Sequence, residues 1–157
     1  MDEIVVDADF EARNYNRAVR VVTSQDCLIF GNEQLLHSAV ENVVRNAVSY
    51  TAEGTVVEVS LRCRNDGENR RVVISVLDKG TGIPQAALAD VFRPFYRVAD
   101  ARDRQSGGIG LGLSISQRAV EVHGGTITTS NAPSGGLLVE ILLLIDALQV
   151  SPADRLY

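Results

Sequence analysis

The sequence predicts an α/β fold, a two-layer sandwich in which about three helices cover one face of a mixed, mainly antiparallel sheet of about five strands. Apolar residues recur with a helical period over residues 32–50. Strand-like runs come in pairs, which cover 55–64 with 70–78 and 125–131 with 136–145. A charged, glycine-rich stretch without period, residues 93–110, has the length of a lid, a binding loop or a disordered segment.

Length and composition limit the classes of protein that fit. The 157 residues suit one domain, and a hydrophobic content of 45% excludes a disordered chain. The net charge of −5 argues against a general nucleic-acid-binding surface. The acidic start lacks the basic region of a signal peptide, and the longest apolar run, 137–145, is too short to span a bilayer. We expect a soluble domain that binds no nucleic acid.

The remaining elements follow from local signals. Residues 1–18 are polar with no clear period, so no element is predicted there. Two short strands are expected at 18–23 and 27–31, and Asn32 is suited to cap the helix that follows. The other expected elements are a turn at 65–69, a short helix at 84–92, a longer helix at 111–123 and an unpatterned tail after Asp146.

The two cysteines, Cys27 and Cys63, lie in apolar, strand-like runs. Neither belongs to a CxxC motif or to a cluster of cysteine and histidine that would hold a metal. We interpret them as two reduced, buried thiols of a cytosolic protein.

Two asparagines, Asn42 and Asn46, lie one turn apart on the border of the apolar face of the first long helix. Asparagine is a poor helix former, because its side chain competes for nearby backbone groups. Carboxamide oxygens suit Mg²⁺, which usually keeps water and substrate phosphates as its other ligands. An ordinary helix flank or a tertiary cap is the alternative.

Two further motifs favour a nucleotide. Asp78 ends an apolar strand and precedes Gly80 and Gly82, so its carboxylate could accept a hydrogen bond from an exocyclic amine while the glycines leave room for a flat ring. An ordinary glycine-rich turn is the alternative. Gly107, Gly108, Gly110 and Gly112 open a helix, where free N–H groups could hold phosphate. A flexible hinge is the alternative there.

Four segments in this order, "NVVRNA", "DKGTGIP", "FRPFYR" and "GGIGLGL", resemble the N, G1, F and G2 boxes of the catalytic ATP-binding domain of sensor histidine kinases. That domain belongs to the gyrase/Hsp90/histidine-kinase/MutL superfamily, and the run from Phe92 onward especially resembles the Cpx-type envelope-stress kinases. The resemblance covers residues 19–145. It implies that 1–18 is a remnant following an absent dimerisation and phosphoacceptor hairpin, and that 146–157 is a tail.

The resemblance also implies roles for individual residues. Asp78 would bind the adenine amine, and Asn46 with Asn42 would be the catalytic residues that hold Mg²⁺. The nucleotide pocket would be lined by Tyr50, Gly80, Gly82 and Ile83; the F box would be Phe92, Phe95 and Tyr96; phosphate would meet Gly108, Gly110, Leu111, Gly112 and Leu113; and the available cations would be Arg97, Arg102 and Arg104. A solvated loop face is the alternative for each arginine.

The sequence departs from the family pattern at three places. Ser49 stands where a cation is common, and Leu137 with Leu138 stands where threonines are common. The two histidines, His37 and His123, lack the acidic neighbour of a phosphoacceptor, so neither is expected to accept phosphate.

The resemblance implies a protein histidine kinase domain that moves the γ-phosphoryl of Mg-ATP to a histidine of a separate domain, with little autophosphorylation by this chain alone. Its partners would be the dimerisation domain and a response regulator. The isolated domain would be a monomer in the cytoplasm, and the parent a homodimer in the bacterial inner membrane. The alternatives are an anti-sigma-factor-type serine kinase and a degenerate nucleotide-binding regulatory module.

Overall fold

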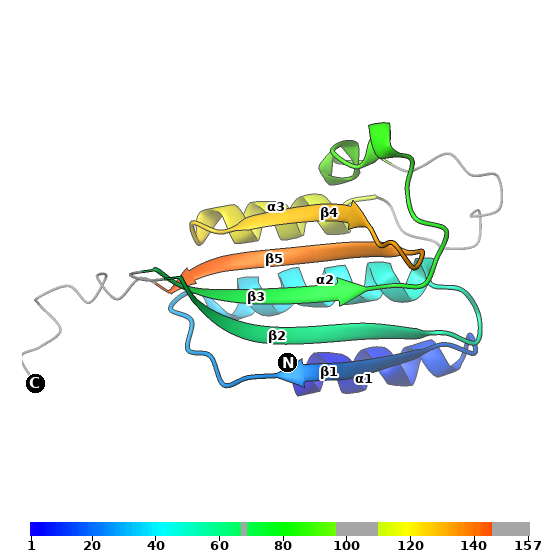
Figure 1. The fold of residues 1–157 in the computed structure, drawn as a ribbon, viewed down its shortest axis with the longest axis horizontal. Coiled ribbons are helices and arrows are strands. Elements are labelled where there is room, and N and C mark those ends of the chain that lie inside the picture. The colour runs from blue at the N-terminus through cyan, green and yellow to red at the C-terminus, as the bar shows by residue number, and fades with distance from the viewer. Residues whose placement is uncertain (67–68, 97–109, 146–157) are drawn as a thin grey trace, which may run out of the picture.

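The computed structural model describes residues 1–66, 69–96 and 110–145 of the chain (Figure 1). The elements are α1 (Asp2–Arg13), β1 (Ala18–Ser24), α2 (Glu33–Tyr50), β2 (Val56–Asp66), β3 (Asn69–Leu77), the 3₁₀ turns η1 (Gln85–Ala87) and η2 (Asp90–Phe92), α3 (Gly112–Val122), β4 (Thr126–Asn131) and β5 (Leu137–Ile145). Residues 97–109 of the predicted lid or binding loop, and the predicted tail 146–157, lie outside the described residues.

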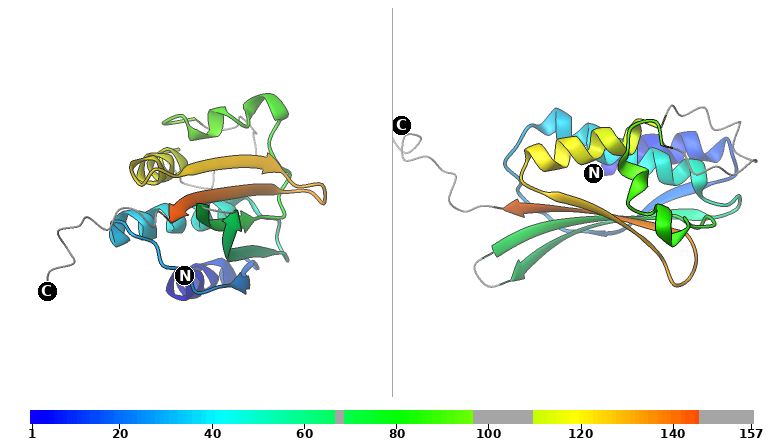
Figure 2. Two further views of the ribbon diagram at one scale, coloured as in Figure 1. Left: turned by 60° about the vertical axis from the view of Figure 1, so that its left-hand side comes forward. Right: turned by 90° about the horizontal axis from the view of Figure 1, so that it is seen from above.

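The five strands form one sheet in the order β1-β2-β3-β5-β4. Only β1 pairs in parallel, with Ala18 opposite Val56, and the other three pairs are antiparallel. All three α-helices cover one face of the sheet (Figure 2). The predicted α/β sandwich with a mixed, mainly antiparallel sheet is therefore confirmed.

Helix α2 begins as its sequence predicts. The Asn32 side chain accepts a hydrogen bond from the Leu35 N–H at 3.0 Å, which satisfies one of the free donors of the first turn. Its apolar stripe is buried from Ala39 to Val48, with Val43 and Val44 at 0% exposure, whereas Leu35 in the first turn is exposed. This packing fixes which way the remaining faces of the helix point, and those faces carry Asn42 and Asn46.

The sequence predicts no helix or strand within residues 1–18, and this prediction is wrong, because Asp2–Arg13 forms α1. Ile4, Val5 and Ala12 are buried in the same core as α2. Charged residues on the exposed side of α1 conceal this spacing in the sequence. Asp9 on α1 accepts the Val19 N–H of β1 at 2.9 Å, and this bond lowers the pKa of Asp9.

The strand expected at 27–31 does not form, and the cysteines are not free thiols. Cys27 and Cys63 form a disulfide with Cα atoms 6.0 Å apart, and it ties the connection between β1 and α2 to β2. The Cys63 N–H of β2 donates to the Gln25 side chain at 2.7 Å and not to a backbone carbonyl of residues 27–31, so no ladder continues into this segment. Leu28 and Phe30 of this segment are exposed instead.

The short helix expected at 84–92 is two 3₁₀ turns, η1 and η2, rather than one α-helix. The segment is too short to repay helix nucleation, and only Val91 within the two turns is buried. The longer helix is confirmed as α3, which packs on α2. The buried Ser116 hydroxyl lies 2.8 Å from the Ala39 carbonyl oxygen and so joins the two helices.

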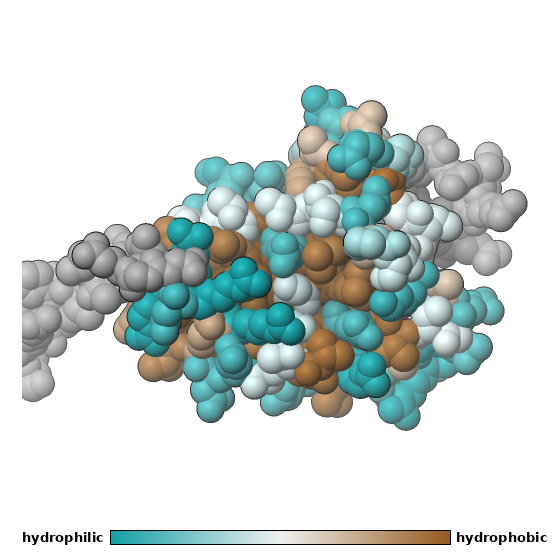
Figure 3. All heavy atoms as spheres, in the orientation of Figure 1, coloured by the Kyte–Doolittle hydropathy of each residue, from teal (hydrophilic) through white to brown (hydrophobic). Residues whose placement is uncertain are grey.

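The second face of the sheet carries no helix in the described residues, and it faces the viewer in Figures 1 and 3. Hydrophilic and hydrophobic side chains mix on it (Figure 3). Side chains alternate along each strand, as in the strictly alternating burial of β5 from Leu137 to Leu143. The single core therefore lies between the sheet and the helices.

Candidate nucleotide site

The motif residues meet at the end of the sheet where β3 ends, β5 begins and α2 ends (Figure 1). The end of α2 is one of these three converging ends, and its last turn carries no charged side chain. Arg17 supplies that charge from outside the helix, since its Nη1 donates to the carbonyl oxygens of Val48 and Ser49 at 3.0 and 3.2 Å.

Asp78 is the buried acid of this region, with 3% of its surface exposed. Its Oδ1 accepts the N–H groups of Gly80 at 2.8 Å and Leu137 at 3.1 Å. Burial raises the pKa of Asp78, although these two N–H groups and Lys79 oppose the shift. Oδ2 has no hydrogen-bond partner among the described residues. One oxygen is thus held by the backbone, and the other is left as an acceptor.

The backbone around Asp78 is packed too tightly for side chains. A Cβ at Gly136, where φ is +92°, would overlap the Asp78 carbonyl oxygen, and one at Gly80 would overlap the Tyr50 carbonyl oxygen. The Thr51 hydroxyl, 1% exposed as a residue, accepts the Lys79 N–H at 3.0 Å. The end of α2 and the start of β5 therefore both fix the loop that follows Asp78.

Asn42 and Asn46 are half-buried on α2, and neither carboxamide has a hydrogen-bond partner among the described residues. A Cβ at Gly112, the first residue of α3, would lie 3.8 Å from the Asn42 Cβ. Fully buried polar groups are normally paired, whereas these half-buried carboxamides keep accessible surface and can meet a ligand or water. Their position fits the neutral oxygen ligands of Mg²⁺.

The third and fourth motifs are joined by their backbones. The Phe95 N–H donates to the Gly110 carbonyl oxygen at 2.9 Å, and Phe95 takes a positive φ of 63°. Phe95 is 69% exposed, whereas Phe92 and Tyr96 pack against the core. Gly110 also has positive φ, and its Cβ would lie 3.0 Å from the Tyr96 carbonyl oxygen. The Phe95–Tyr96 segment is thereby held beside the residues that lead into α3.

The profile of the family described as "Histidine kinase-, DNA gyrase B-, and HSP90-like ATPase" matches residues 31–147. The chain belongs to this ATPase family.

Similarity narrows the class within this ATPase family. The chain is 39% identical over 142 residues to the sensor histidine kinase CpxA of Escherichia coli K12, which covers 90% of this chain and 30% of that protein. The mycobacterial sensor histidine kinase MprB shares its fold with TM-score 0.73 at 27% identity, over 92% and 93% of the two chains. The nucleotide-free catalytic domain of histidine kinase ThkA does so with TM-score 0.75 at 25% identity, over 90% and 88%.

These comparisons support an ATPase catalytic domain of the sensor histidine kinase type and do not favour the serine-kinase alternative. The chain spans about 30% of the length of the curated relatives that it matches most strongly. Within the described residues, no helix is long and apolar enough to cross a membrane.

The structure describes most of the residues predicted for the nucleotide site, and the remaining ones lie outside the described residues. Tyr50 is 42% exposed at the end of α2, Ile83 is partly buried after the Asp78 loop, and Leu113 is buried in the first turn of α3. Leu111 caps α3 beside Gly112. Outside the described residues lie Arg97, Arg102, Arg104, Gly107 and Gly108.

Sequence reasoning missed Thr51 and Asn131, which hold the Asp78 loop from two sides. The Asn131 side chain bonds both backbone groups of Ile83. Asn131 ends a strand just before a Pro-Ser-Gly-Gly turn, a signal for a turn residue but not for contact with residue 83. His37 and His123 are outside the site, and His123 caps α3 while its Nε2 accepts the Asn32 N–H at 2.9 Å.

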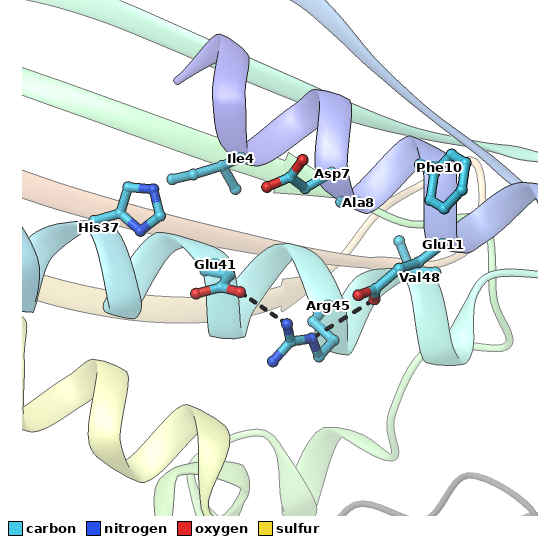
Figure 4. A pocket seen from close by; sticks show the side chains of 9 residues that line it. All are labelled: Ile4, Asp7, Ala8, Phe10, Glu11, His37, Glu41, Arg45 and Val48. Atoms are coloured by element: carbon cyan, nitrogen blue, oxygen red, sulfur yellow. Dashed lines mark hydrogen bonds and ion pairs between the residues drawn. The ribbon is translucent and has the colours of Figure 1, made fainter.

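A hollow of about 220 Å³ lies between α1 and α2, away from Asp78 (Figure 4). Arg45 crosses it, with ion pairs to Glu41 at 2.8 Å and Glu11 at 3.9 Å. Its lining residues are Ile4, Asp7, Ala8, Phe10, Glu11, His37, Glu41, Arg45 and Val48. None of these lining residues is a predicted site residue. Glu41 and Arg45 directly precede Asn42 and Asn46, but neighbours in an α-helix point about 100° apart, so the hollow and the two asparagines lie on different faces of α2. Asn42 lies instead on the side of α2 that faces the start of α3.

Proposed function

We propose that this chain binds Mg-ATP and, within its parent protein, transfers the γ-phosphoryl group to a histidine of a separate dimerisation domain. The observation that carries the proposal is Asp78: a buried carboxylate with Oδ1 held by two backbone N–H groups and Oδ2 without a described partner. Membership of the ATPase family supports nucleotide binding.

Asp78 is suited to recognise adenine because an ionised carboxylate accepts hydrogen bonds and donates none. Its Oδ2 would accept the exocyclic amine of the base. Gly80 packs against the end of α2, so the loop carries little side-chain bulk beside the carboxylate. Ile83 and Tyr50 would contact the flat ring from either end of this loop.

Asn46 and Asn42 would hold Mg²⁺ together with water and the phosphates, since neither carboxamide is otherwise paired in the described part of the chain. When bound, the ion would neutralise phosphate charge in the transfer. Asn42 lies beside Gly112 at the start of α3, where free N–H groups would face the phosphates. In phosphoryl transfer the protein acts by positioning and charge stabilisation, which is what these groups provide.

The phosphoacceptor histidine would come from a partner domain, because His123 has both ring nitrogens engaged and His37 lies in the hollow between α1 and α2. The exposed Phe95 would face the partner helices. A response regulator would then receive the phosphoryl group. The parent would be a homodimeric kinase of the bacterial inner membrane, with this domain in the cytoplasm.

The test is Asn46→Ala, measured by titration calorimetry with ADP and Mg²⁺. We expect affinity to fall by about 10-fold or more, since a metal ligand is lost. Stability should stay equal or rise by up to about 0.7 kcal/mol, because alanine is the better helix former. Gln34→Ala, an exposed amide at the other end of α2, is the matched control and should leave affinity unchanged.

Two results would count against the proposal. If wild type binds no Mg-ADP at millimolar concentration, the chain is a degenerate module. If Asn46→Ala unfolds the domain while affinity per folded molecule is unchanged, the asparagine is structural. Incubation with γ-labelled ATP adds a separate check, since strong, stable labelling of this chain alone would contradict the need for a partner histidine.

A further inference from the structure

The loop from Asp78 to Ile83 is fixed at both ends by one hairpin, β4–β5. At its first end, the Asp78 N–H donates to the Leu137 carbonyl oxygen at 3.1 Å, and the Leu137 N–H donates to Asp78 Oδ1 at 3.1 Å. At its second end, Asn131 Oδ1 accepts the Ile83 N–H at 2.9 Å, and Asn131 Nδ2 donates to the Ile83 carbonyl oxygen at 2.6 Å.

Asn131 suits this position better than other polar residues. Pairing with both backbone groups of one residue needs a donor and an acceptor on the same short side chain, and a carboxamide offers them on two separate atoms. Gly82 lies directly against it, since a Cβ there would be 2.6 Å from Asn131 Oδ1. The close approach of loop and side chain therefore depends on both residues.

The loop between these two attachments contains Gly80 and Gly82, the residue type that loses most conformational freedom on ordering. The bond from the Gly80 N–H to Asp78 Oδ1 lies inside it. If the Ile83 end were released, Gly80 would sample more conformations, and the Asp78 carboxylate would lose part of the support that orients its free oxygen.

We propose that Asn131 is a positioning residue for base recognition: it holds the loop so that Asp78 presents its free oxygen to the exocyclic amine. This inference rests on the proposed function, in which Asp78 recognises adenine. It predicts that Asn131 governs discrimination between bases and not merely stability.

The experiment compares ADP with IDP, in which an oxo group replaces the exocyclic amine, by calorimetry with Mg²⁺. A hydrogen bond to a charged group makes wild type prefer ADP by about 10-fold or more. In Asn131→Ala this preference should fall to within about 3-fold, because ADP loses affinity while IDP changes little. Asn131→Asp, which keeps the acceptor and loses the donor, should fall in between and serves if the alanine variant does not fold.

Thr129→Val is the matched control. Thr129 lies on the same strand, and its hydroxyl donates to the Leu88 carbonyl oxygen at 2.9 Å, so the variant also loses one bond from β4 to a loop. It should keep the wild-type preference for ADP. If Asn131→Ala weakens ADP and IDP equally, or matches the control, the positioning role is wrong.

A second readout works without nucleotide. Amide hydrogen exchange at Gly80 should be faster in Asn131→Ala than in Thr129→Val, and equal rates would overturn the proposal. If wild type binds ADP and IDP equally while Gly80 exchange responds to Asn131, the loop is held as inferred but Asp78 does not read the amine. That result contradicts the proposed function itself.

Discussion

The two ends of the sheet hold α2 by opposite means. At the Asp78 end, backbone bonds, a buried threonine and close glycine contacts do so. At the other end, about 20 Å away by strand geometry, the Cys27–Cys63 disulfide and the His123–Asn32 bond do so. His123 has both ring nitrogens bonded, whereas Asp78, Asn42 and Asn46 keep polar atoms without partners among the described residues.

This difference shows how the site is recognised. Where His123 serves structure, both of its ring nitrogens are paired. Where polar side chains serve a ligand, the backbone takes over the structural role and leaves side-chain atoms free. The comparison predicts that changes at the Asp78 end alter nucleotide affinity, and that changes at the disulfide end alter only stability.

The largest effect is expected for Gly136→Ala. The new Cβ would overlap the Asp78 carbonyl oxygen at a positive φ, so the chain must shift where the carboxylate is held. We expect a loss of about 3 kcal/mol or more in unfolding free energy and a roughly 100-fold loss in ADP affinity. Denaturant titration and calorimetry measure the two.

Gly54→Ala is the control, because Gly54 also has a positive φ, +74°, but no atom lies within 4 Å of the added Cβ. It should cost about 1–2 kcal/mol of stability and leave ADP affinity unchanged. Equal effects of the two variants on affinity would show that the contact with Asp78 does not matter.

The disulfide end should behave in the opposite way. Replacing Cys27 and Cys63 with serine opens a link across 36 residues, which should lower the free energy of unfolding by about 4 kcal/mol. ADP affinity of the folded protein should change less than about 2-fold, because the link is remote from Asp78. Dithiothreitol should destabilise wild type but not the serine variant; identical unfolding of both would show that the cysteines are not bonded.

The smallest effect on stability, with opposite sign, is expected for Asp78→Asn. Burial raises the folded-state pKa of Asp78, so the unfolded chain ionises first as the pH rises above about 4. The carboxyl therefore costs stability progressively from there up to its folded pKa. Asp78→Asn should be more stable relative to wild type at pH 7 than at pH 3.5, as denaturant titrations at both values would measure.

The same variant should lose about 10–100-fold in ADP affinity, because an amide N–H₂ would face the adenine amine in place of an acceptor. A gain in stability with a loss of binding would mark Asp78 as kept for function. If its stability advantage is the same at both pH values, burial does not raise the folded-state pKa of Asp78.

Local patterns were enough to predict most of the fold. The cap at Asn32, the helix α2, the two hairpins and the acid at the end of β3 all rest on signals within a few residues of each other. Helix α1 had such a signal in Ile4, Val5 and Ala12, but exposed charges obscured it. The four motifs were therefore predicted together with the elements that carry them.

Features that join distant segments could not be predicted. The bond between Cys27 and Cys63 requires that residues 27–31 lie beside β2, and no local pattern says so. The contact of Asn131 with Ile83 requires the order β3-β5-β4 within the sheet. The parallel pairing of β1 with β2 likewise depends on α2 crossing the sheet.

The bond from the Val19 N–H to Asp9 affects whether a strand of another chain can add to the sheet. β1 is an edge strand, and an edge with free N–H groups is a place where strands of other chains can add. Asp9 already occupies one of these donors from the neighbouring helix. An incoming strand would have to displace a charged acceptor, so α1 protects the domain against strand addition at the β1 edge.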